Sequence, residues 1–413
     1  MSTPSPTAHQ TSRDTERERR VLARLDIEGV ATLTEALVEA GGQSPDGFEE
    51  PTVAVLGDAL RTIGADIRLT QVRPGRPNLI ARVGQDQAEP GLLYLGHSDV
   101  VPAGAGWSGG PFTPRRVDGQ IIGRGAADMK GGLAAAVAAI AAVHAEAPEI
   151  PLTLLCTIDE EADALGIRHH ITSTTTPIRY DACVVVEPTS MSIITGCRGA
   201  TNLRVDVRGA SAHAGRPADG ASAILAAAEV IAAVEFDGVE LQSMAHSALG
   251  VGTWNIGTIS GGHGTSIVPD RCTLSIDRRT LPDEDPDLIL GQLLQDSRAR
   301  VRKRARPGTE RITISGAVEM TMPGFLTDPA SPLVGDICAA VRDAGAPGDL
   351  GVWTASCEAG FIARHHGAPT VVLGPGDLHR QAHQPDESVP IDELLTAARA
   401  YALIALRTSN YTA

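Results

Sequence analysis

The chain has 413 residues, of which 42% are hydrophobic and 21% are charged, and its formal net charge is −15. This length exceeds the size at which one hydrophobic core stops growing, so we expect two domains. The negative charge argues against a protein that binds nucleic acid or an anionic membrane, and six scattered cysteines without a C-x-x-C pair argue against a disulfide framework.

The N-terminal segment MSTPSPTAHQTSRDTERERR lacks the apolar core of a signal peptide. The most apolar long stretch, residues 131–143, is mostly alanine and is shorter than the roughly 20 residues that a membrane-spanning helix needs. We therefore expect a soluble, cytoplasmic protein.

Helices and strands alternate in the first half of the chain. Apolar residues recur at helical spacing over 14–40 and 53–64, and strands are expected at 66–72 and 78–83. An Ala-rich helix is expected at 131–147. Short continuous apolar runs are typical of buried strands in a parallel sheet, and the chain has four of them, at 92–95, 152–158, 182–186 and 370–373.

The pattern changes between residues 195 and 322. Strands at 202–208, 254–259 and 272–277 and helices at 221–234 and 288–304 predict a small α+β sandwich inserted into the main domain. Helices at 332–344 and 391–406 then complete the main domain. The predicted fold class is α/β: a mixed, mostly parallel sheet flanked by helices, formed by residues 1–194 and 323–413, with an inserted domain at 195–322.

Each of the four apolar strands leads into a loop that carries His, Asp or Glu. Ligands bind at the carboxyl ends of the strands in open α/β sheets, so these side chains are candidates for a shared site. A further acidic residue directly precedes the Ala-rich helix. The full set is His97, Asp99, Asp128, Glu160, Glu161, Glu187 and His383.

Imidazole and carboxylate ligands suit zinc or a similar divalent ion. Five of these residues are candidate ligands, which is too many for one catalytic zinc; with one carboxylate bridging, they divide evenly between two ions. Two ions can acidify a shared water, and an adjacent carboxylate such as Glu160 can stay free as a general base. The candidate ligands are His97, Asp128, Glu161, Glu187 and His383.

Five motifs in this order, GHSDVVP, GRGAADMKGG, DEEADALG, EPTSM and AHQPDE, closely resemble the co-catalytic zinc aminoacylase/carboxypeptidase metallopeptidase family, of the acetylornithine deacetylase and succinyl-diaminopimelate desuccinylase type. The resemblance extends from about residue 20 to 408. It implies a zinc-exopeptidase-like catalytic domain, an inserted lid that joins two chains in a homodimer, and two divalent ions, zinc or alternatively cobalt or manganese.

The resemblance also implies individual roles. His97 and Glu187 resemble ligands of the first metal, Glu161 and His383 those of the second, and Asp128 the bridging carboxylate, followed by a cis peptide bond to Met129. Asp99 resembles the carboxylate that orients the imidazole of the first ligand, and Glu160 resembles the general base.

Within the inserted segment, His213 in RGASAHAGRP matches a histidine that stabilises the tetrahedral oxyanion, often from the partner subunit. Arg279 in DRRTLP, and more weakly Arg198, resemble residues that bind the substrate carboxylate.

Two other substrate-binding candidates depart from the family pattern: Ser266 replaces an Asn, and Glu358 lies in the sequence SCEAG where the family has Thr-Glu or Ser-Asp. Alternatives remain open: His213 as a packed turn residue and Arg279 as an ion-pair partner of Asp277.

The motifs EPTSM and CEAGF favour removal of an acyl group from an N-acyl amino acid. A metallo-dipeptidase or carboxypeptidase is the alternative within hydrolases, and a non-enzymatic binding protein on the same scaffold is the alternative from another class. In each case the partner is a small molecule. The sequence leaves open the acyl group, the amino-acid side chain, the native metal and whether His213 acts within its own chain.

Overall fold

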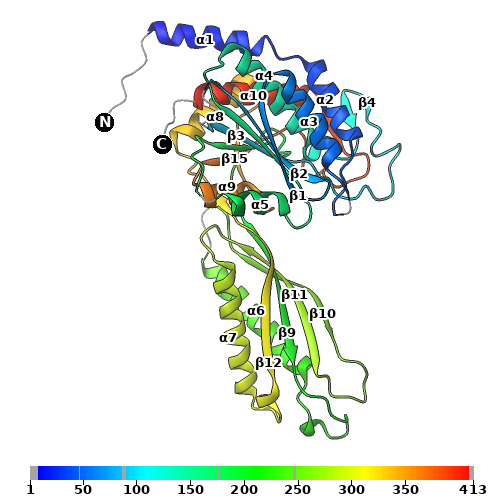
Figure 1. The fold of residues 1–413 in the computed structure, drawn as a ribbon. Helices are drawn as coiled ribbons and strands as arrows, with labels where there is room; N and C mark the ends of the chain where they lie inside the picture. Colours follow the sequence, from blue (N-terminus) through cyan, green and yellow to red (C-terminus); the bar gives the residue numbers. More distant parts are fainter. Residues whose placement is uncertain (1–7, 46, 86–89, 175, 245–247, 409–413) are drawn as a thin grey trace. The chain divides into compact units, whose positions relative to one another are not determined.

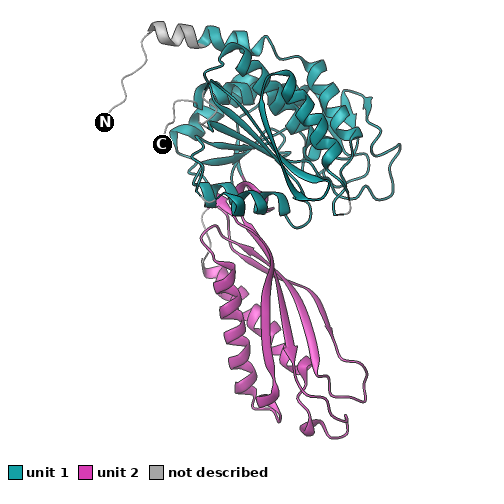
Figure 2. Ribbon diagram, in the orientation of Figure 1, with its two compact units in different colours: residues 1–196, 326–351, 361–413 teal, residues 197–325, 352–360 magenta. Residues whose placement is uncertain are grey.

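A computed structural model describes residues 8–45, 47–85, 90–174, 176–244 and 248–408. The chain forms two compact units, coloured separately in Figure 2. Unit 1 contains residues 1–196, 326–351 and 361–413, and unit 2 contains residues 197–325 and 352–360.

A nine-stranded sheet is the centre of unit 1 (Figure 1). Its four middle strands are parallel and adjacent, and they are the four apolar runs of the sequence: β6 (Leu152–Thr157), β3 (Leu92–His97), β7 (Cys183–Val185) and β15 (Thr370–Val372). All residues of these strands are buried, which explains their continuous apolar sequence. On one side the sheet continues with β2 (Arg76–Val83) and β1 (Asp66–Arg73), and on the other with β8 (Ile193–Cys197), β13 (Phe325–Leu326) and β14 (Leu350–Trp353).

Helices pack on this sheet and on one another. Tyr401 connects α10 to the sheet through two hydrogen bonds of 2.7 Å. The backbone carbonyl of Tyr401 accepts one from the hydroxyl of Tyr94, and the hydroxyl of Tyr401 donates the other to the carbonyl of Leu373. The helices of this part of the chain are α1 (Ala8–Leu22), α2 (Ile27–Glu39), α3 (Glu50–Thr62), α4 (Gly131–Glu146), α5 (Leu165–Ser173), α8 (Pro332–Ala344), α9 (Ala359–His366) and α10 (Ile391–Thr408).

The Ala-rich helix α4 begins at Gly131 as predicted and ends at Glu146, one residue before the predicted end. The segment η1 (Ala126–Lys130) leads directly into α4, although Asp128 and Met129 within it have non-helical backbone angles. Taken together with α4, it forms a stretch of 21 residues that is long and apolar enough to cross a membrane. Most of this stretch is buried inside unit 1. Its apolar character is therefore that of a core helix.

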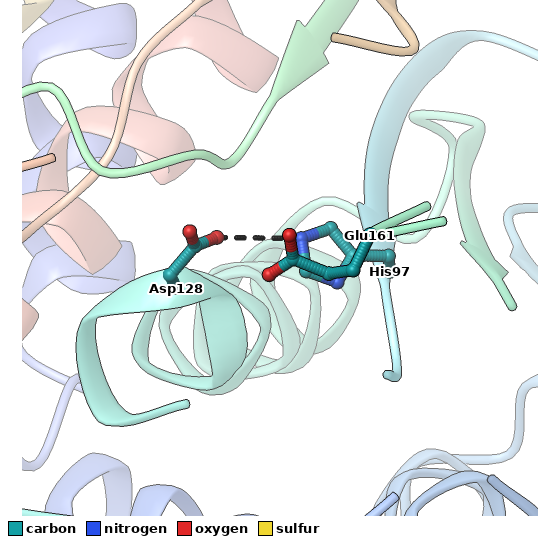
Figure 3. Close-up of side chains that lie close together, drawn as sticks. All are labelled: His97, Asp128 and Glu161. Atoms are coloured by element: carbon teal, nitrogen blue, oxygen red, sulfur yellow. Dashed lines mark ion pairs between the residues drawn. The ribbon is translucent and has the colours of Figure 1, made fainter. Parts of the chain in front are cut away.

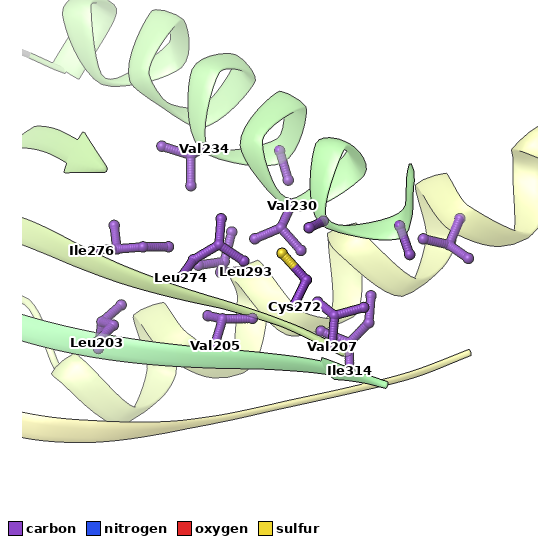
Figure 4. Packing of buried hydrophobic residues seen from close by; sticks show 14 of the residues in the cluster. Leu203, Val205, Val207, Val230, Val234, Cys272, Leu274, Ile276, Leu293 and Ile314 are labelled. Carbon is purple, nitrogen blue, oxygen red and sulfur yellow. The ribbon is translucent and has the colours of Figure 1, made fainter. Parts of the chain in front are cut away.

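Unit 2 is an antiparallel four-stranded sheet covered by two helices, in the order β10 (Thr253–Gly261), β11 (Arg271–Thr280), β9 (Gly199–Arg208), β12 (Thr313–Met322). The helices are α6 (Ala223–Leu241) and α7 (Pro286–Arg304). Alternate residues of β9 and β11 point into the core beneath the helices, as Figure 4 shows for Leu203, Val205, Leu274 and Ile276. The fold class is that predicted from the sequence.

Candidate metal centre

Strand order brings the candidate ligands together. His97 is the last residue of β3, Glu161 follows β6, and Glu187 follows β7. These strands are parallel neighbours, with His97 in register with Thr157, so their following residues emerge at one edge of the sheet. Asp128 lies in η1, and His383 lies in the loop after β15.

The carboxylate of Asp128 lies between two imidazoles. Its Oδ1 is 3.3 Å from Nε2 of His97, and its Oδ2 is 3.3 Å from Nε2 of His383. Figure 3 shows Asp128 facing the ring of His97. The Asp128–Met129 peptide bond is cis, as the resemblance implies.

Each imidazole also faces one glutamate. Oε1 of Glu187 is 3.6 Å from Nε2 of His97, and Oε2 of Glu161 is 3.1 Å from Nε2 of His383. All four are mostly buried except His383, whose side chain is 49% exposed. The structure thus arranges the five candidate ligands as two His–Glu pairs around one shared aspartate.

These side chains fit a divalent cation. Nε2 of His97 is buried and has no hydrogen-bond partner among the residues that the structure describes. Three carboxylates nevertheless lie close to this imidazole, those of Asp128, Glu187 and Glu161. Ligand atoms of His97, Asp128 and Glu161 lie within 4.8 Å of one another. An imidazole nitrogen directed at several carboxylates is the donor set of zinc and similar ions.

Burial and mutual charge shift the protonation of the centre. Burial and the charge of Asp128 raise the pKa of Glu187 and of Glu161. Burial lowers the pKa of His97, but the carboxylates of Asp128 and Glu187 more than offset this and raise it well above its ordinary value. The carboxylates of Asp128 and Glu161 raise the pKa of His383 to about 10. A cation that binds to these atoms must therefore displace protons.

Asp99 makes a different contact from the one that the resemblance implies. Nδ1 of His97 donates a hydrogen bond to the carbonyl oxygen of Asp99 at 2.9 Å, whereas the carboxylate is 3.6 Å from that nitrogen. The two carboxylate oxygens instead accept hydrogen bonds from the backbone amides of Glu160 and Glu161, each at 3.1 Å. Asp99 therefore links the first histidine to the loop that carries both glutamates.

Two buried ion pairs support the loops that carry the candidate ligands, and no motif in the sequence marks their residues for this role. Asp159 precedes the two glutamates with a positive φ of 66°, and its carboxylate pairs with Arg76 at 2.7 Å. Arg124 and Glu387 form a second buried pair, at 2.6 Å, next to Asp128. The only signal for Glu387 in the sequence is its place at the end of the motif AHQPDE.

His213 and Ser266 belong to unit 2 and lie on adjacent, exposed segments. His213 forms an isolated β-bridge with Ile267, and the amide of Ala214 donates to the carbonyl of Ser266 at 3.0 Å. Nδ1 of His213 accepts a hydrogen bond from the amide of Gly215, so the neutral ring carries its proton on Nε2. The imidazole can therefore act as a donor.

The other three substrate-binding candidates also belong to unit 2. Nε of Arg279 pairs with the carboxylate of Asp277 at 3.0 Å, which is the ion pair expected as the alternative to substrate binding. Arg198 donates to the carbonyl of Val251 at 2.7 Å, while its buried Nε has no hydrogen-bond partner among the described residues. Glu358 is buried, with 1% of its surface exposed.

A model of peptidase family M20/M25/M40 matches residues 93–407 of the chain. The acetylornithine deacetylase of Vibrio vulnificus is 34% identical over 364 residues, which cover 87% of this chain and 92% of that protein. The acetylornithine deacetylase of Vibrio cholerae (strain ATCC 39541) is 32% identical over 346 residues, covering 83% and 87%.

Solved structures show the same fold. The aminopeptidase PepT from Bacillus cereus has a TM-score of 0.75 at 23% identity and covers 94% of this chain and 100% of that chain. The M20 family metallo-carboxypeptidase Sso-CP2 from Sulfolobus solfataricus has a TM-score of 0.72 at 18% identity, covering 92% and 99%.

Proposed function

Because the chain belongs to peptidase family M20/M25/M40, a family of metal-dependent hydrolases, we propose that it hydrolyses the amide bond of an N-acyl amino acid. The observation that carries this proposal is the shared position of Asp128 between His97 and His383. The names of the Vibrio relatives, with 32–34% identity over most of the chain, support a deacylase.

We propose two ions in this centre, zinc by preference, with cobalt or manganese accepting the same donors. His97 and Glu187 would hold one ion, His383 and Glu161 would hold the other, and Asp128 would bridge them. When bound, such ions lower the pKa of a water molecule and polarise a carbonyl group.

In this proposal Glu160 is the general base. It accepts a proton from the attacking water and later donates it to the leaving nitrogen. The negative charge of Glu160 acts on both His97 and Glu187, which supports a position close to the ligands. Its backbone amide is held by Asp99, so the residue starts from a fixed main chain.

Unit 2 would supply the contacts to the substrate. His213 donates from Nε2 to the developing oxyanion, either in its own chain or in a partner subunit. Arg279 and Arg198 bind the substrate carboxylate, for which a planar guanidinium is well shaped. Ser266 and Glu358 would help to select the acyl group and the side chain of the substrate.

We further propose a cytoplasmic homodimer formed through unit 2. The helix α6 has large apolar side chains on its solvent side, and β10 forms an edge of the sheet; both features favour pairing with a second copy. The exposed side chains are Ile224, Leu225, Phe236 and Val239. All six cysteines are buried and none forms a disulfide, as is usual in a reducing compartment.

The test is a substrate panel with the zinc- or cobalt-loaded protein: N-acetyl, N-succinyl and N-formyl amino acids, and dipeptides. The proposal expects release of a carboxylate and a free α-amine from at least one N-acyl amino acid. Turnover of dipeptides alone would replace it with the dipeptidase or carboxypeptidase alternative. Binding without turnover of any amide would support a non-enzymatic protein.

A further inference from the structure

Glu387 is fully buried and lies four residues after His383, between the loop of that ligand and β16 (Ser388–Pro390). Its Oε1 accepts hydrogen bonds from the backbone amides of Ala127 and Asp128, both at 3.0 Å. The carboxylate thus holds the main chain at the residue whose side chain lies between the two histidines.

Arg124 balances the charge of this carboxylate. It is 1% exposed, and its Nη1 lies 2.6 Å from Oε2 of Glu387. The guanidinium also donates to the carbonyl of Ala103 at 3.3 Å and lies 5.1 Å from the centre of the Trp107 ring. A buried carboxylate is stable only when such a partner and further hydrogen bonds satisfy it, and Glu387 has both.

We propose that Glu387, neutralised by Arg124, is a positioning residue that fixes Asp128 with one carboxylate oxygen toward His97 and the other toward His383. The inference rests on the proposed metal centre. Glu387 and His383 share one short loop, so the same contact also sets the separation between Asp128 and His383.

The chemistry of the contact is specific to a carboxylate. One oxygen of Glu387 faces two N–H donors and the other faces a guanidinium, so every partner is a donor. A Gln at this position would direct its NH₂ group either at the two backbone amides or at the guanidinium, and the donors that it faces would be left unpaired. Losing a residue that orients a metal ligand typically weakens metal binding ~10–100-fold.

The experiment measures the dissociation constant of zinc by competition with a chromophoric chelator, in wild type and in Glu387→Gln. We expect binding ~10–100-fold weaker in the variant. The control is Asp386→Asn, in the same loop. The carboxylate of Asp386 accepts a hydrogen bond from the backbone amide of Ser108 and forms an ion pair with Arg115, and it makes no contact that positions Asp128. Its zinc affinity should stay within about threefold of wild type.

Zinc affinity of Glu387→Gln within about threefold of wild type, or equal losses in both variants, would overturn the inference. If Glu387→Gln does not fold, Arg124→Lys keeps the charge but lacks the planar fork. Weaker zinc binding by Arg124→Lys supports the inference, and unchanged binding overturns it.

The zinc measurement is independent of the substrate. A wild type that binds zinc but cleaves no N-acyl amino acid would refute the proposed deacylase activity alone. A wild type that binds no zinc would refute the metal centre itself.

Discussion

His97 donates its Nδ1 hydrogen to the backbone carbonyl of Asp99, and the carboxylate of Asp99 is turned away to the amides of Glu160 and Glu161. Asp99 therefore connects a proposed ligand of the first ion to the proposed general base and to a proposed ligand of the second ion. The consequence is that a change in the Asp99 side chain should act on the glutamate loop more than on the histidine.

For Asp99→Asn we expect kcat to fall ~10–100-fold, because an amide can accept only one of the two N–H groups that the carboxylate now accepts. The carbonyl contact to His97 is unchanged by the substitution. Steady-state kinetics with full metal loading will check this. An unchanged kcat would show that the glutamate loop holds its conformation without Asp99.

Glu160→Gln should lower kcat by about 10²–10⁴-fold, since proton transfer by a positioned base contributes this much. Its metal content should match wild type, because Glu160 is not among the five proposed ligands. The check combines kinetics with elemental analysis. Full activity in this variant would exclude Glu160 as the base.

Metal stoichiometry should follow the geometry around Asp128. We expect about two divalent ions per chain in wild type and about one in His383→Ala, since Asp128 and the His97–Glu187 pair remain. Asp128→Ala should lose most of both ions, because each His–Glu pair loses its shared carboxylate. Elemental analysis after dialysis measures this. Equal metal content in the two variants would contradict a bridging role.

Acid should destabilise the fold through two buried histidines away from the centre. Burial lowers the pKa of His170 and of His366 to about 4, against about 6.5 in an unfolded chain. Between these values the unfolded chain binds protons that the folded chain does not. The free energy of unfolding therefore falls as the pH drops from 6.5 to 4, by a few kcal/mol in order of magnitude.

Urea unfolding at pH 7 and pH 4.5 measures this loss. His170→Phe keeps an aromatic ring beside His366 but removes one titrating group, so its loss on acidification should be smaller. The control is His379→Gln, at an exposed position, which should lose as much stability as wild type. If all three proteins lose the same free energy of unfolding on acidification, His170 is not one of the groups that cause the loss.

Packing of α4 against the sheet should tolerate no side chain at Gly132. A Cβ atom there would lie 2.0 Å from the carbonyl oxygen of Val186, directly before the proposed ligand Glu187. We expect Gly132→Ala to cost ~1–3 kcal/mol of stability through overpacking. Gly335→Ala in α8 is the matched control, because its Cβ would enter open space and should add up to ~1 kcal/mol. Thermal unfolding compares the two, and equal midpoints would contradict the expected clash.

The sequence predicts the strands that are buried on both faces. The strands β3, β6, β7 and β15 are continuous apolar runs because both faces of the sheet are covered. By contrast, α5 has the sequence LGIRHHITS and β12 has TISGAVEMTM, and neither was predicted. In β12 the signal was present but missed, because Ile314, Val318 and Met322 fall on the alternate positions that the strand buries more deeply. In α5 the polar residues give little local signal, and contacts to parts distant in sequence stabilise the helix.

The sequence by itself was also enough to identify the candidate ligands, because imidazole and carboxylate groups, which suit a divalent metal ion, follow the buried strands. Only the tertiary structure decided what holds them. The contact between Glu387 and the amide of Asp128 spans 259 positions, and that of Asp99 with Glu160 spans 61. Both are hydrogen bonds from a side chain to a backbone amide, and any residue except proline can supply such an amide, so no local pattern marks the partner.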